Sequence, residues 1–245
     1  MSAIPSQGKP SEGTAVKDGL GRPLKALRVS VTDRCNLRCQ YCMPEEEYVW
    51  LPRETLLTFE EIVFLTDLCT RQGVDKVRIT GGEPLLRKNV PALIAMLRQN
   101  PRIQDIAITT NGVLLAEQGQ DLFDAGLHRV TVSLDTLKPE RFKALTRRDT
   151  LAQVFEGIES VGKVGFTGLK LDTVAMKGYN DDELIPLIEY GKQVNAEVRF
   201  IEYMDVGGAN DWSPEKVLSR KDILLALSLH YGTIEPVEEE STAPD

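Results

Sequence analysis

The chain has 245 residues and a formal net charge of -8, from 29 Lys and Arg against 37 Asp and Glu. This length is enough for one large hydrophobic core, and α/β barrels of this size often form a single domain. The acidic balance argues against a non-specific nucleic-acid binder and against a protein of anionic membrane surfaces, although it does not exclude a local cationic pocket.

The N-terminal segment, residues 1–20, is rich in Pro, Gly and Ser and contains almost no large apolar side chain. Such a segment cannot bury enough apolar surface to offset the entropy lost on ordering its backbone. We therefore expect a disordered arm over residues 1–20. Gly21-Arg22-Pro23 then leads into a domain that we expect to span residues 21–231.

Apolar residues in this domain recur with the period of a strand and, in alternation, with the period of a helix. The predicted strands are 27–32, 76–80, 105–109, 129–134, 168–175 and 196–204. The predicted helices are 58–71, 89–99, 114–124, 139–145, 151–163, 181–192 and 220–229. Thr58 and Glu61 form a capping-box signature at the first helix, and Ile62, Leu65 and Cys69 are expected on its core face.

Six strand–helix units with short connections predict parallel strands joined by right-handed crossovers. The predicted fold is therefore α/β, a partial (incomplete) TIM barrel of about six β/α units. The acidic ending, residues 232–245, is too short to supply the two missing units of a full barrel, and we interpret it as a tail that begins a truncated C-terminal region. A doubly wound open sheet is the alternative.

Three of the four cysteines lie in one loop directly after the first predicted strand, at Cys35, Cys39 and Cys42. Three thiolates on one loop can bind three irons of a 4Fe–4S cluster, and the absent fourth ligand leaves one iron open to bind and reduce a small molecule. Disulfides and a zinc site completed from elsewhere are the alternatives. Because we find no signal peptide and no apolar run of ~18 residues, we expect a cytoplasmic protein with reduced thiols.

Polar residues gather at the ends of the predicted strands, where parallel α/β folds place their ligand sites. They are the cysteine loop, residues 80–84, residues 109–112, Ser133 with Asp135, and residues 203–205. Gly81-Gly82 allows a backbone to approach a ligand closely, with an ordinary left-handed turn before a helix as the alternative.

Four predicted strands carry one basic residue amid apolar neighbours: Arg28, Arg78, Lys170 and Arg199. A buried cation is costly unless an anion accompanies it. Ion pairs with Asp172 or Glu202 would explain one or two of these cations. Four cations that face one lumen would instead bind a polyanion such as a nucleoside triphosphate.

The cysteine spacing, with Tyr41 before the last cysteine, resembles the signature of radical S-adenosylmethionine (SAM) enzymes, and Gly81-Gly82-Glu83-Pro84 resembles their motif for the methionine amine. Further motifs resemble the MoaA family of GTP 3′,8-cyclases of molybdenum cofactor biosynthesis. They lie, in the same order as in that family, at 27–36, 41–44, 78–85, 109–112, 133–135 and 199–205. The resemblance covers about residues 18–237.

This resemblance implies two cofactors, a 4Fe–4S cluster on Cys35, Cys39 and Cys42, and SAM bound to the open iron. It implies that SAM is held by Tyr41, Gly82, Ser133 and Met204. It implies that GTP is held by Arg28, Arg78, Thr109 and Lys170, and we add Arg199 to this substrate set. The implied activity is that of a radical SAM lyase that uses a 5′-deoxyadenosyl radical to convert GTP to (8S)-3′,8-cyclo-7,8-dihydroguanosine 5′-triphosphate.

The implied partners are an electron donor, a second copy in a homodimer and a downstream cyclic pyranopterin monophosphate synthase, with neither nucleic acid nor a membrane. The chain lacks the family's second cysteine triad and terminal Gly-Gly, and Asp172 replaces the asparagine usual after the substrate lysine. We therefore expect a truncated sequence in which SAM binding survives better than cyclisation. A short radical SAM enzyme for another substrate, and a zinc or nucleotide-binding module without redox chemistry, are the alternatives.

Overall fold

The computed structural model of the protein describes residues 16–206, 210 and 212–237. Its strands are β1 (Ala26–Ser30), β2 (Lys76–Thr80), β3 (Asp105–Thr110), β4 (Arg129–Ser133), β5 (Gly168–Ala175) and β6 (Ala196–Glu202). Its α-helices are α1 (Phe59–Thr70), α2 (Val90–Arg98), α3 (Leu115–Asp124), α4 (Pro139–Thr146), α5 (Leu151–Val164), α6 (Leu184–Gln193) and α7 (Arg220–Tyr231). Short 3-10 turns lie at Arg53–Thr55, Pro84–Leu86, Asp181–Glu183 and Pro214–Lys216.

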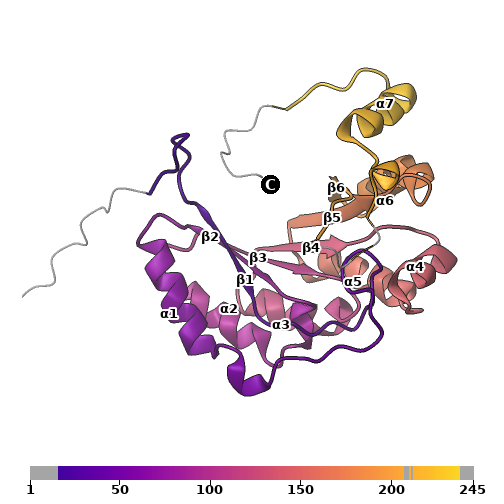
Figure 1. The fold of residues 1–245 in the computed structure, drawn as a ribbon. Coiled ribbons are helices and arrows are strands. Elements are labelled where there is room, and N and C mark those ends of the chain that lie inside the picture. The colour runs from indigo at the N-terminus through magenta and orange to yellow at the C-terminus, as the bar shows by residue number, and fades with distance from the viewer. Residues whose placement is uncertain (1–15, 207–209, 211, 238–245) are drawn as a thin grey trace, which may run out of the picture.

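The strands form one sheet in which every neighbouring pair is parallel and the spatial order is β1-β2-β3-β4-β5-β6. Figure 1 shows α1, α2, α3 and α5 on one side of this curved sheet, with α6 and α7 near its β6 end. A doubly wound sheet would reverse its strand order part-way, and this sheet does not. The predicted partial barrel of six β/α units is therefore confirmed.

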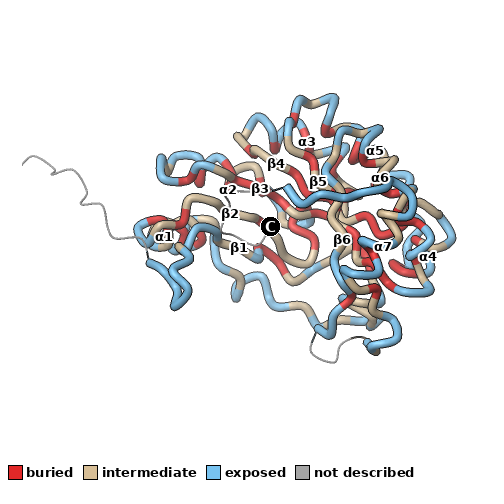
Figure 2. Tube along the Cα trace, turned by 90° about the horizontal axis from the view of Figure 1, so that it is seen from above, coloured by how far each residue is buried: buried red, intermediate tan, exposed pale blue. Residues whose placement is uncertain are grey.

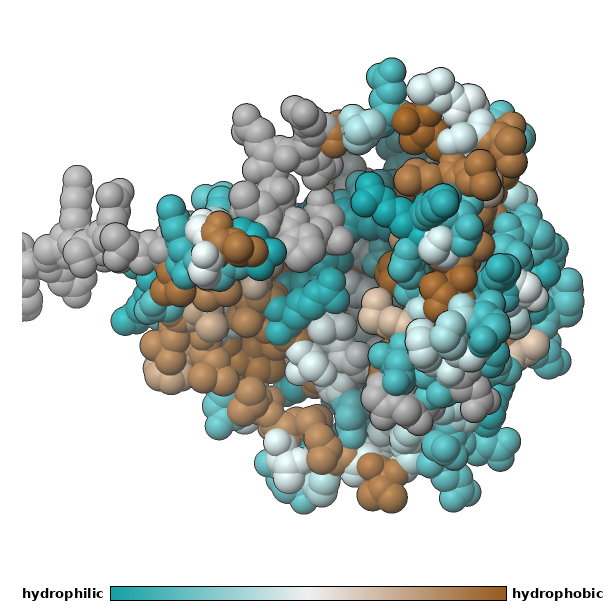
Figure 3. Space-filling view, turned by 45° about the horizontal axis from the view of Figure 1, so that its top comes forward, coloured by the Kyte–Doolittle hydropathy of each residue, from teal (hydrophilic) through white to brown (hydrophobic). Residues whose placement is uncertain are grey.

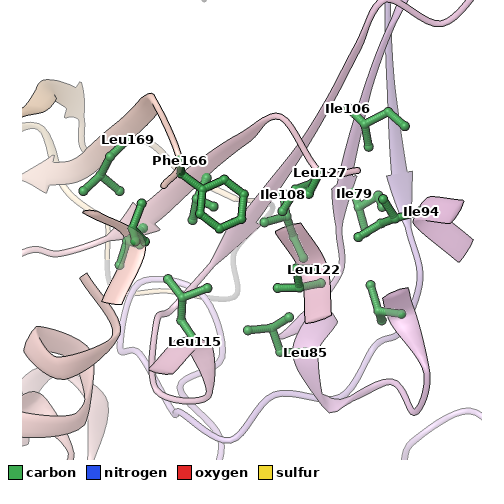
Figure 4. Packing of buried hydrophobic residues seen from close by; sticks show 14 of the residues in the cluster. Ile79, Leu85, Ile94, Ile106, Ile108, Leu115, Leu122, Leu127, Phe166 and Leu169 are labelled. Carbon is green, nitrogen blue, oxygen red and sulfur yellow. The ribbon is translucent and has the colours of Figure 1, made fainter. Parts of the chain in front are cut away.

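The main core lies between the outer face of the sheet and the helices that cover it. Figure 4 shows Ile79, Ile106 and Ile108 from the strands packed with Ile94 and Leu122 from the helices, and all five are buried. Seen from above in Figure 2, the buried segments run through the middle of the molecule and the exposed ones around its edge. Alternate strand residues therefore face the opposite, inner side of the sheet, which we call the lumen.

Helix α1 begins as predicted and buries a different face from the predicted one. The Thr58 hydroxyl accepts from the amide of Glu61 at 3.2 Å, and the Glu61 carboxylate accepts from the amide of Thr58 at 2.7 Å, which confirms the capping box. The buried residues are Ile62, Thr66 and Thr70, spaced by one helical turn. The expectation for Leu65 and Cys69 was wrong, since Leu65 is 46% exposed and Cys69 is half-buried.

Hydrophobic side chains also gather on the surface over α1, at the left of the view in Figure 3, while hydrophilic ones occupy the middle of that face. Phe64, Leu65 and Leu68 are the large exposed apolar residues of this helix. Because α1 lies beside the edge strand β1, the sheet covers only one of its faces, and the periodicity alone does not show which face that is.

The predicted helix 181–192 begins with the 3-10 turn Asp181–Glu183 and continues as α6, with Pro186 in its first turn, where proline is tolerated. The turn carries Glu183, whose buried carboxylate accepts from the Thr136 hydroxyl and from the amide of Leu137, both at 2.7 Å. This buried acceptor ties the start of α6 to the loop that follows β4.

Most of the predicted disordered arm, residues 1–20, lies outside the described residues, as do residues 238–245 of the acidic tail and residues 207–209 and 211. At the described end of the arm, the amide of Val16 donates to the Gln72 carbonyl at 3.1 Å, and the Asp18 carboxylate accepts from the amides of Leu20 and Arg22. The domain limits remain predictions. Among the helices that the structure describes, none combines the length and the apolar character that a membrane span requires.

Candidate active site

The cysteine loop, residues 35–42, follows β1 and is fixed in place by backbone hydrogen bonds. The amides of Cys42 and Met43 close its turn by donating to the carbonyl oxygen of Cys39, at 3.0 and 2.8 Å. The amides of Arg38 and Gln40 donate to carbonyl oxygens at the end of α4, at 2.9 and 3.0 Å. Helix α4 therefore supports the loop from a distant part of the chain, through hydrogen bonds that span more than a hundred residues of sequence.

The three cysteines of the loop line one cavity of about 220 Å³. The carboxyl ends of β2, β3 and β4 supply the other polar residues of its wall, namely residues 80–83, 109–111, Ser133 and Asp135. These segments, which were predicted to lie together at the strand ends, thus line a single cavity. We refer to it as the thiol cavity.

Burial changes the acidity of the thiols in this cavity. Cys35 and Cys39 are half-buried, and loss of hydration is the main reason that their pKa values are raised, most strongly for Cys39. Burial disfavours a thiolate unless a cation compensates its charge. A cationic metal cluster in this cavity would supply that compensation.

The glycines that follow β2 are required by the approach of another backbone segment. The amide of Gly82 donates to the carbonyl of Thr32 and the amide of Glu83 donates to the carbonyl of Arg34, both at 2.7 Å. A Cβ on Gly81 would lie 2.6 Å from the Thr32 oxygen, and a Cβ on Gly82 would overlap the Arg34 carbonyl. Neither glycine has a positive φ, so the left-handed-turn alternative was wrong. The pair lets the turn after β2 pack directly on the chain that leads into Cys35.

Glu83 connects this turn to the end of β3. Its buried carboxylate accepts from the hydroxyl of Thr110 and the amide of Asn111, both at 2.7 Å, and from the amide of Leu85 at 3.0 Å. Burial raises the pKa of Glu83, and these three hydrogen bonds oppose the shift. Asn111 in turn donates to Asn36 at 2.7 Å, so the network ends on the cysteine loop.

Tyr41 points its ring into the fold. Its hydroxyl donates to Oδ2 of Asp135 at 2.7 Å, while Oδ1 of Asp135 accepts from the amide of Val174 at 2.8 Å. Burial raises the pKa of Asp135 to about 6, against the lowering effect of these hydrogen bonds. Because the Tyr41 side chain is engaged in this way, the group that it offers to a ligand at the rim is its backbone carbonyl.

That carbonyl is joined to the end of β6 through Asn210. The Nδ2 atom of Asn210 donates to the carbonyl of Tyr41 at 3.1 Å and to the carbonyl of Met204 at 3.2 Å. Met204 is 57% exposed and does not line the thiol cavity. Of the four residues predicted to hold SAM, the structure thus brings Tyr41, Gly82 and Ser133 to that cavity and leaves Met204 beside it.

A second cavity, of about 360 Å³, is lined by Arg28, Arg78, Arg199, Asp172, Phe200 and Ile201. We call it the cationic cavity. Burial, the largest cause, lowers the pKa of Arg78, and the positive charges of Arg28, Arg129 and Arg199 lower it further. Arg28 is exposed, so the burial cost assumed from the sequence does not apply to that residue. Three of the four cations predicted to face one lumen thus line this cavity, and Lys170 is not among its lining residues.

Arg78 links the two cavities. Its Nη1 atom donates to the hydroxyl of Thr131 at 3.0 Å and to the hydroxyl of Thr109 at 3.3 Å. Thr109 belongs to the wall of the thiol cavity, whereas Arg78 belongs to the cationic cavity. The two spaces therefore adjoin at this hydrogen bond.

Lys170 and Arg199 pair with an acid that the sequence analysis missed. The side chains of Lys170 and Arg199 are only 13% and 16% exposed, and they contact the Glu197 carboxylate at 3.1 and 2.7 Å. The alternative from the sequence, ion pairs with Asp172 or Glu202, did not include this partner. Glu197 lies two residues before Arg199, on the same face of β6, and that spacing was the available signal.

The sheet register arranges the lumen residues in rows across the strands. One row contains Arg28 and Arg78, which are paired partners on β1 and β2. The next row toward the carboxyl ends pairs Thr109, Thr131, Lys170 and Glu197. The row beyond pairs Ser133, Asp172 and Arg199. The cations thus occupy three successive rows of the lumen, and Arg199 shares its row with Ser133 of the thiol cavity.

The sequence model of the radical SAM superfamily matches residues 29–191. The chain belongs to the radical SAM superfamily. The matched segment runs from β1 to α6 and includes the cysteine loop and most of both cavities.

Curated relatives of this radical SAM protein are named GTP 3′,8-cyclase. GTP 3′,8-cyclase 3 of Mycobacterium tuberculosis (strain CDC 1551 / Oshkosh) is 53% identical over 233 residues, which cover 94% of this chain and 62% of the relative. GTP 3′,8-cyclase 1 of Mycobacterium tuberculosis (strain ATCC 25618 / H37Rv) is 51% identical over 245 residues, covering 98% and 68%. The enzyme of Staphylococcus aureus (strain Mu50 / ATCC 700699) is 46% identical over 228 residues, covering 91% and 66%. The resemblance to the MoaA cyclases is confirmed, and the chain spans about three fifths of the length of the first of these relatives.

Solved structures with the same fold are more distant in sequence. Native anSMEcpe with bound AdoMet has a TM-score of 0.66 at 19% identity, over 84% of this chain and 60% of that chain. Methylornithine synthase (PylB) has a TM-score of 0.64 at 17% identity, over 84% and 62%. At these identities the likeness shows the fold alone.

Membership in the radical SAM superfamily implies a 4Fe–4S cluster and SAM as cofactors, and the thiol cavity fits the cluster. All four cysteines are free thiols, which removes the disulfide alternative. Across the described ranges, no three Cys, His, Asp or Glu side chains converge on a single metal ion. A 4Fe–4S cluster takes each thiolate at a different iron, and the three cysteines that line this one cavity can each bind one iron. Two groups donate hydrogen bonds to Cys35 Sγ, namely the amide of Leu37 at 3.5 Å and Nδ2 of Asn111 at 3.9 Å. Such hydrogen bonds orient a ligating sulfur.

Proposed function

We propose that this chain is a radical SAM enzyme of molybdenum cofactor biosynthesis that binds GTP and cyclises it to (8S)-3′,8-cyclo-7,8-dihydroguanosine 5′-triphosphate. The names of relatives that are 46–53% identical support this assignment. The observation that carries it is the hydrogen bond between Arg78 and Thr109, because it joins a thiol cavity suited to the cofactors to a cationic cavity suited to a triphosphate.

In this proposal Cys35, Cys39 and Cys42 are the cluster ligands, and SAM is held by Tyr41, Gly82, Ser133 and Met204. When bound, the cluster and SAM together supply the 5′-deoxyadenosyl radical. The protein's part is positioning. The turn at Gly82 presents backbone groups next to the cysteine loop. The side-chain amide of Asn210 bridges the carbonyls of Tyr41 and Met204. These two carbonyls can therefore accept hydrogen bonds from the exocyclic amine of the SAM adenine.

The substrate set in this proposal is Arg28, Arg78, Thr109, Lys170 and Arg199. Arginine and lysine hydrogen bonds to phosphate are charge-assisted, and each is worth about 1.5–3 kcal/mol. Because Lys170 and Arg199 are already paired with Glu197, the arginines of the β1–β2 row are the less neutralised contacts for the phosphates. The same proposal includes an electron donor and a downstream cyclic pyranopterin monophosphate synthase as partners. It also includes a homodimeric state and a cytoplasmic location.

The test is anaerobic reconstitution of the 245-residue chain with iron and sulfide, followed by incubation with SAM and a reductant. We expect about four irons for its one cysteine triad, and deoxyadenosine formation that GTP stimulates and ATP does not. Product analysis for the cyclised nucleotide separates the initiation of the reaction from its completion. Cleavage of SAM that is indifferent to GTP would point to another substrate, and zinc without iron would refute the radical chemistry.

A further inference from the structure

Asp172 presents a buried acceptor atom without a hydrogen-bonded partner in a cavity of cations. It lies in the middle of β5 and lines the cationic cavity. Its Oδ1 atom is buried, and no described residue donates a hydrogen bond to it. Unsatisfied buried acceptors are rare in native proteins and cost about 1–3 kcal/mol each, so this atom needs an explanation.

The cations around Asp172 do not supply that hydrogen bond. Loss of hydration is the largest cause and raises the pKa of Asp172. The opposite effect, a lowering of this pKa, comes from the positive charges of Arg199, Arg78, Arg28 and Lys170. Lys170 and Arg199 contact Glu197 instead, and Arg78 donates to two threonines. The carboxylate therefore lines the cationic cavity, and its buried Oδ1 atom is left without a donor from the described residues.

The position of Asp172 in the sheet defines which part of a nucleotide it meets. It pairs with Ser133 on β4 and with Arg199 on β6, in the row nearest the carboxyl ends of the strands. Lys170 lies one row deeper, about 6.6 Å away along the strand. Arg28 and Arg78 lie in the deepest row and are not the cations that pair with Glu197, so phosphates held there would place the neighbouring sugar nearer to Asp172 than another phosphate.

Charge excludes the phosphate part of the ligand. A carboxylate accepts hydrogen bonds and donates none, and it repels phosphate oxygens. The complementary group is therefore a neutral donor. Because the row of Asp172 also contains Ser133, which lines the thiol cavity, this donor lies at the boundary between the two cavities.

We propose that Asp172 is a specificity-determining residue that accepts a hydrogen bond from a sugar hydroxyl of the nucleotide and selects ribonucleotides over deoxyribonucleotides. This inference rests on the proposed function, because it takes the cationic cavity as the GTP site. An asparagine here would keep one acceptor, add a donor and remove the charge. The aspartate therefore binds hydrogen-bond donors only, whereas an asparagine would bind donors and acceptors.

The experiment is equilibrium binding of GTP, 2′-deoxy-GTP and 3′-deoxy-GTP to the reconstituted, SAM-bound chain. In the wild type we expect at least one deoxynucleotide to bind about 10- to 100-fold more weakly than GTP, as for loss of a hydrogen bond to a charged group. In Asp172→Ala this ratio should fall to about one. In Asp172→Asn, which keeps the size of the side chain, the ratio should fall part of the way, and all three nucleotides should bind more tightly because one negative charge is removed.

Glu197→Gln is the matched control, since it removes a lumen carboxylate that is already paired. It should change the three affinities together and leave their ratio unaltered. A wild type without discrimination, or a ratio that both Asp172 variants retain, would overturn the inference while GTP binding stands. Absence of GTP binding in the wild type and in the control would instead overturn the proposed function, and this inference with it.

Discussion

The buried carboxylate of Glu83 provides the sharpest test of how the fold supports the thiol cavity. Glu83 is 1% exposed and accepts three hydrogen bonds, from the Thr110 hydroxyl and the amides of Asn111 and Leu85. Glu83→Gln keeps the size of the side chain and replaces one acceptor oxygen by an NH₂ donor. Because Oε2 serves only the amide of Asn111, the cheapest arrangement of the variant leaves that amide facing another donor.

The expected cost follows from this single broken hydrogen bond. Leaving a buried donor unpaired costs about 1–3 kcal/mol, and the acceptor that the Asn111 amide loses is charged, so we expect a fall of about 2–3 kcal/mol in the free energy of unfolding. Glu83→Ala should cost more, because all three donors lose their acceptor and a cavity is left behind. Since Asn111 also contacts Asn36 in the cysteine loop, both variants should bind iron less completely.

Urea denaturation of the iron-free protein measures the stability change, and iron content after reconstitution measures the second effect. Glu156→Gln makes the same chemical change at an exposed position of α5 and should be neutral within about 0.5 kcal/mol. If Glu83→Gln unfolds at the same urea concentration as this control, the reasoning about the buried carboxylate is wrong.

Three further predictions address the cluster, the glycine turn and an ion pair. Cys39→Ala should abolish cluster binding, whereas Cys69→Ala on α1 should retain the full iron content, as measured by iron and sulfide analysis; equal loss in both would refute the assignment of the ligands. Gly82→Ala should destabilise the fold strongly because its Cβ would overlap a carbonyl oxygen, whereas Gly162→Ala in α5, where a Cβ meets nothing within 4 Å, should stabilise it by about 0.5–1 kcal/mol in thermal unfolding; the reverse order would contradict the packing. Hydrogen bonds to Arg141 and Lys138 lower the pKa of Asp182 to about 2 from 3.8, so its stabilising contribution is complete above pH 3.8 and is lost as the pH falls through about 2. Asp182 is 52% exposed, so Asp182→Asn should cost less than about 1 kcal/mol at pH 7, and the difference from wild type should shrink toward pH 2 rather than grow.

The sequence alone determined the features that depend on local patterns. The alternation of strand and helix periods predicted the six β/α units, the Thr58–Glu61 pair predicted the start of α1, and the spacing of three cysteines predicted an open cluster site. The first two are confirmed and the cluster ligands stay a prediction, and each of the three patterns acts within a few residues of the chain. Basic residues inside apolar strands were informative for a similar reason, since a strand alternates its faces residue by residue.

Only the tertiary structure decided which distant residues meet. It assigned Lys170 and Arg199 to Glu197, left Oδ1 of Asp172 without a donor, and showed that Gly81 and Gly82 are required by the chain before Cys35. It also decided which face of α1 is buried. Such contacts depend on strand register, which determines which side chains of neighbouring strands lie side by side. They also depend on how helices pack at the edge of the sheet. No period within a single segment contains that information, because each strand's pattern is unchanged when its neighbour slides by two residues.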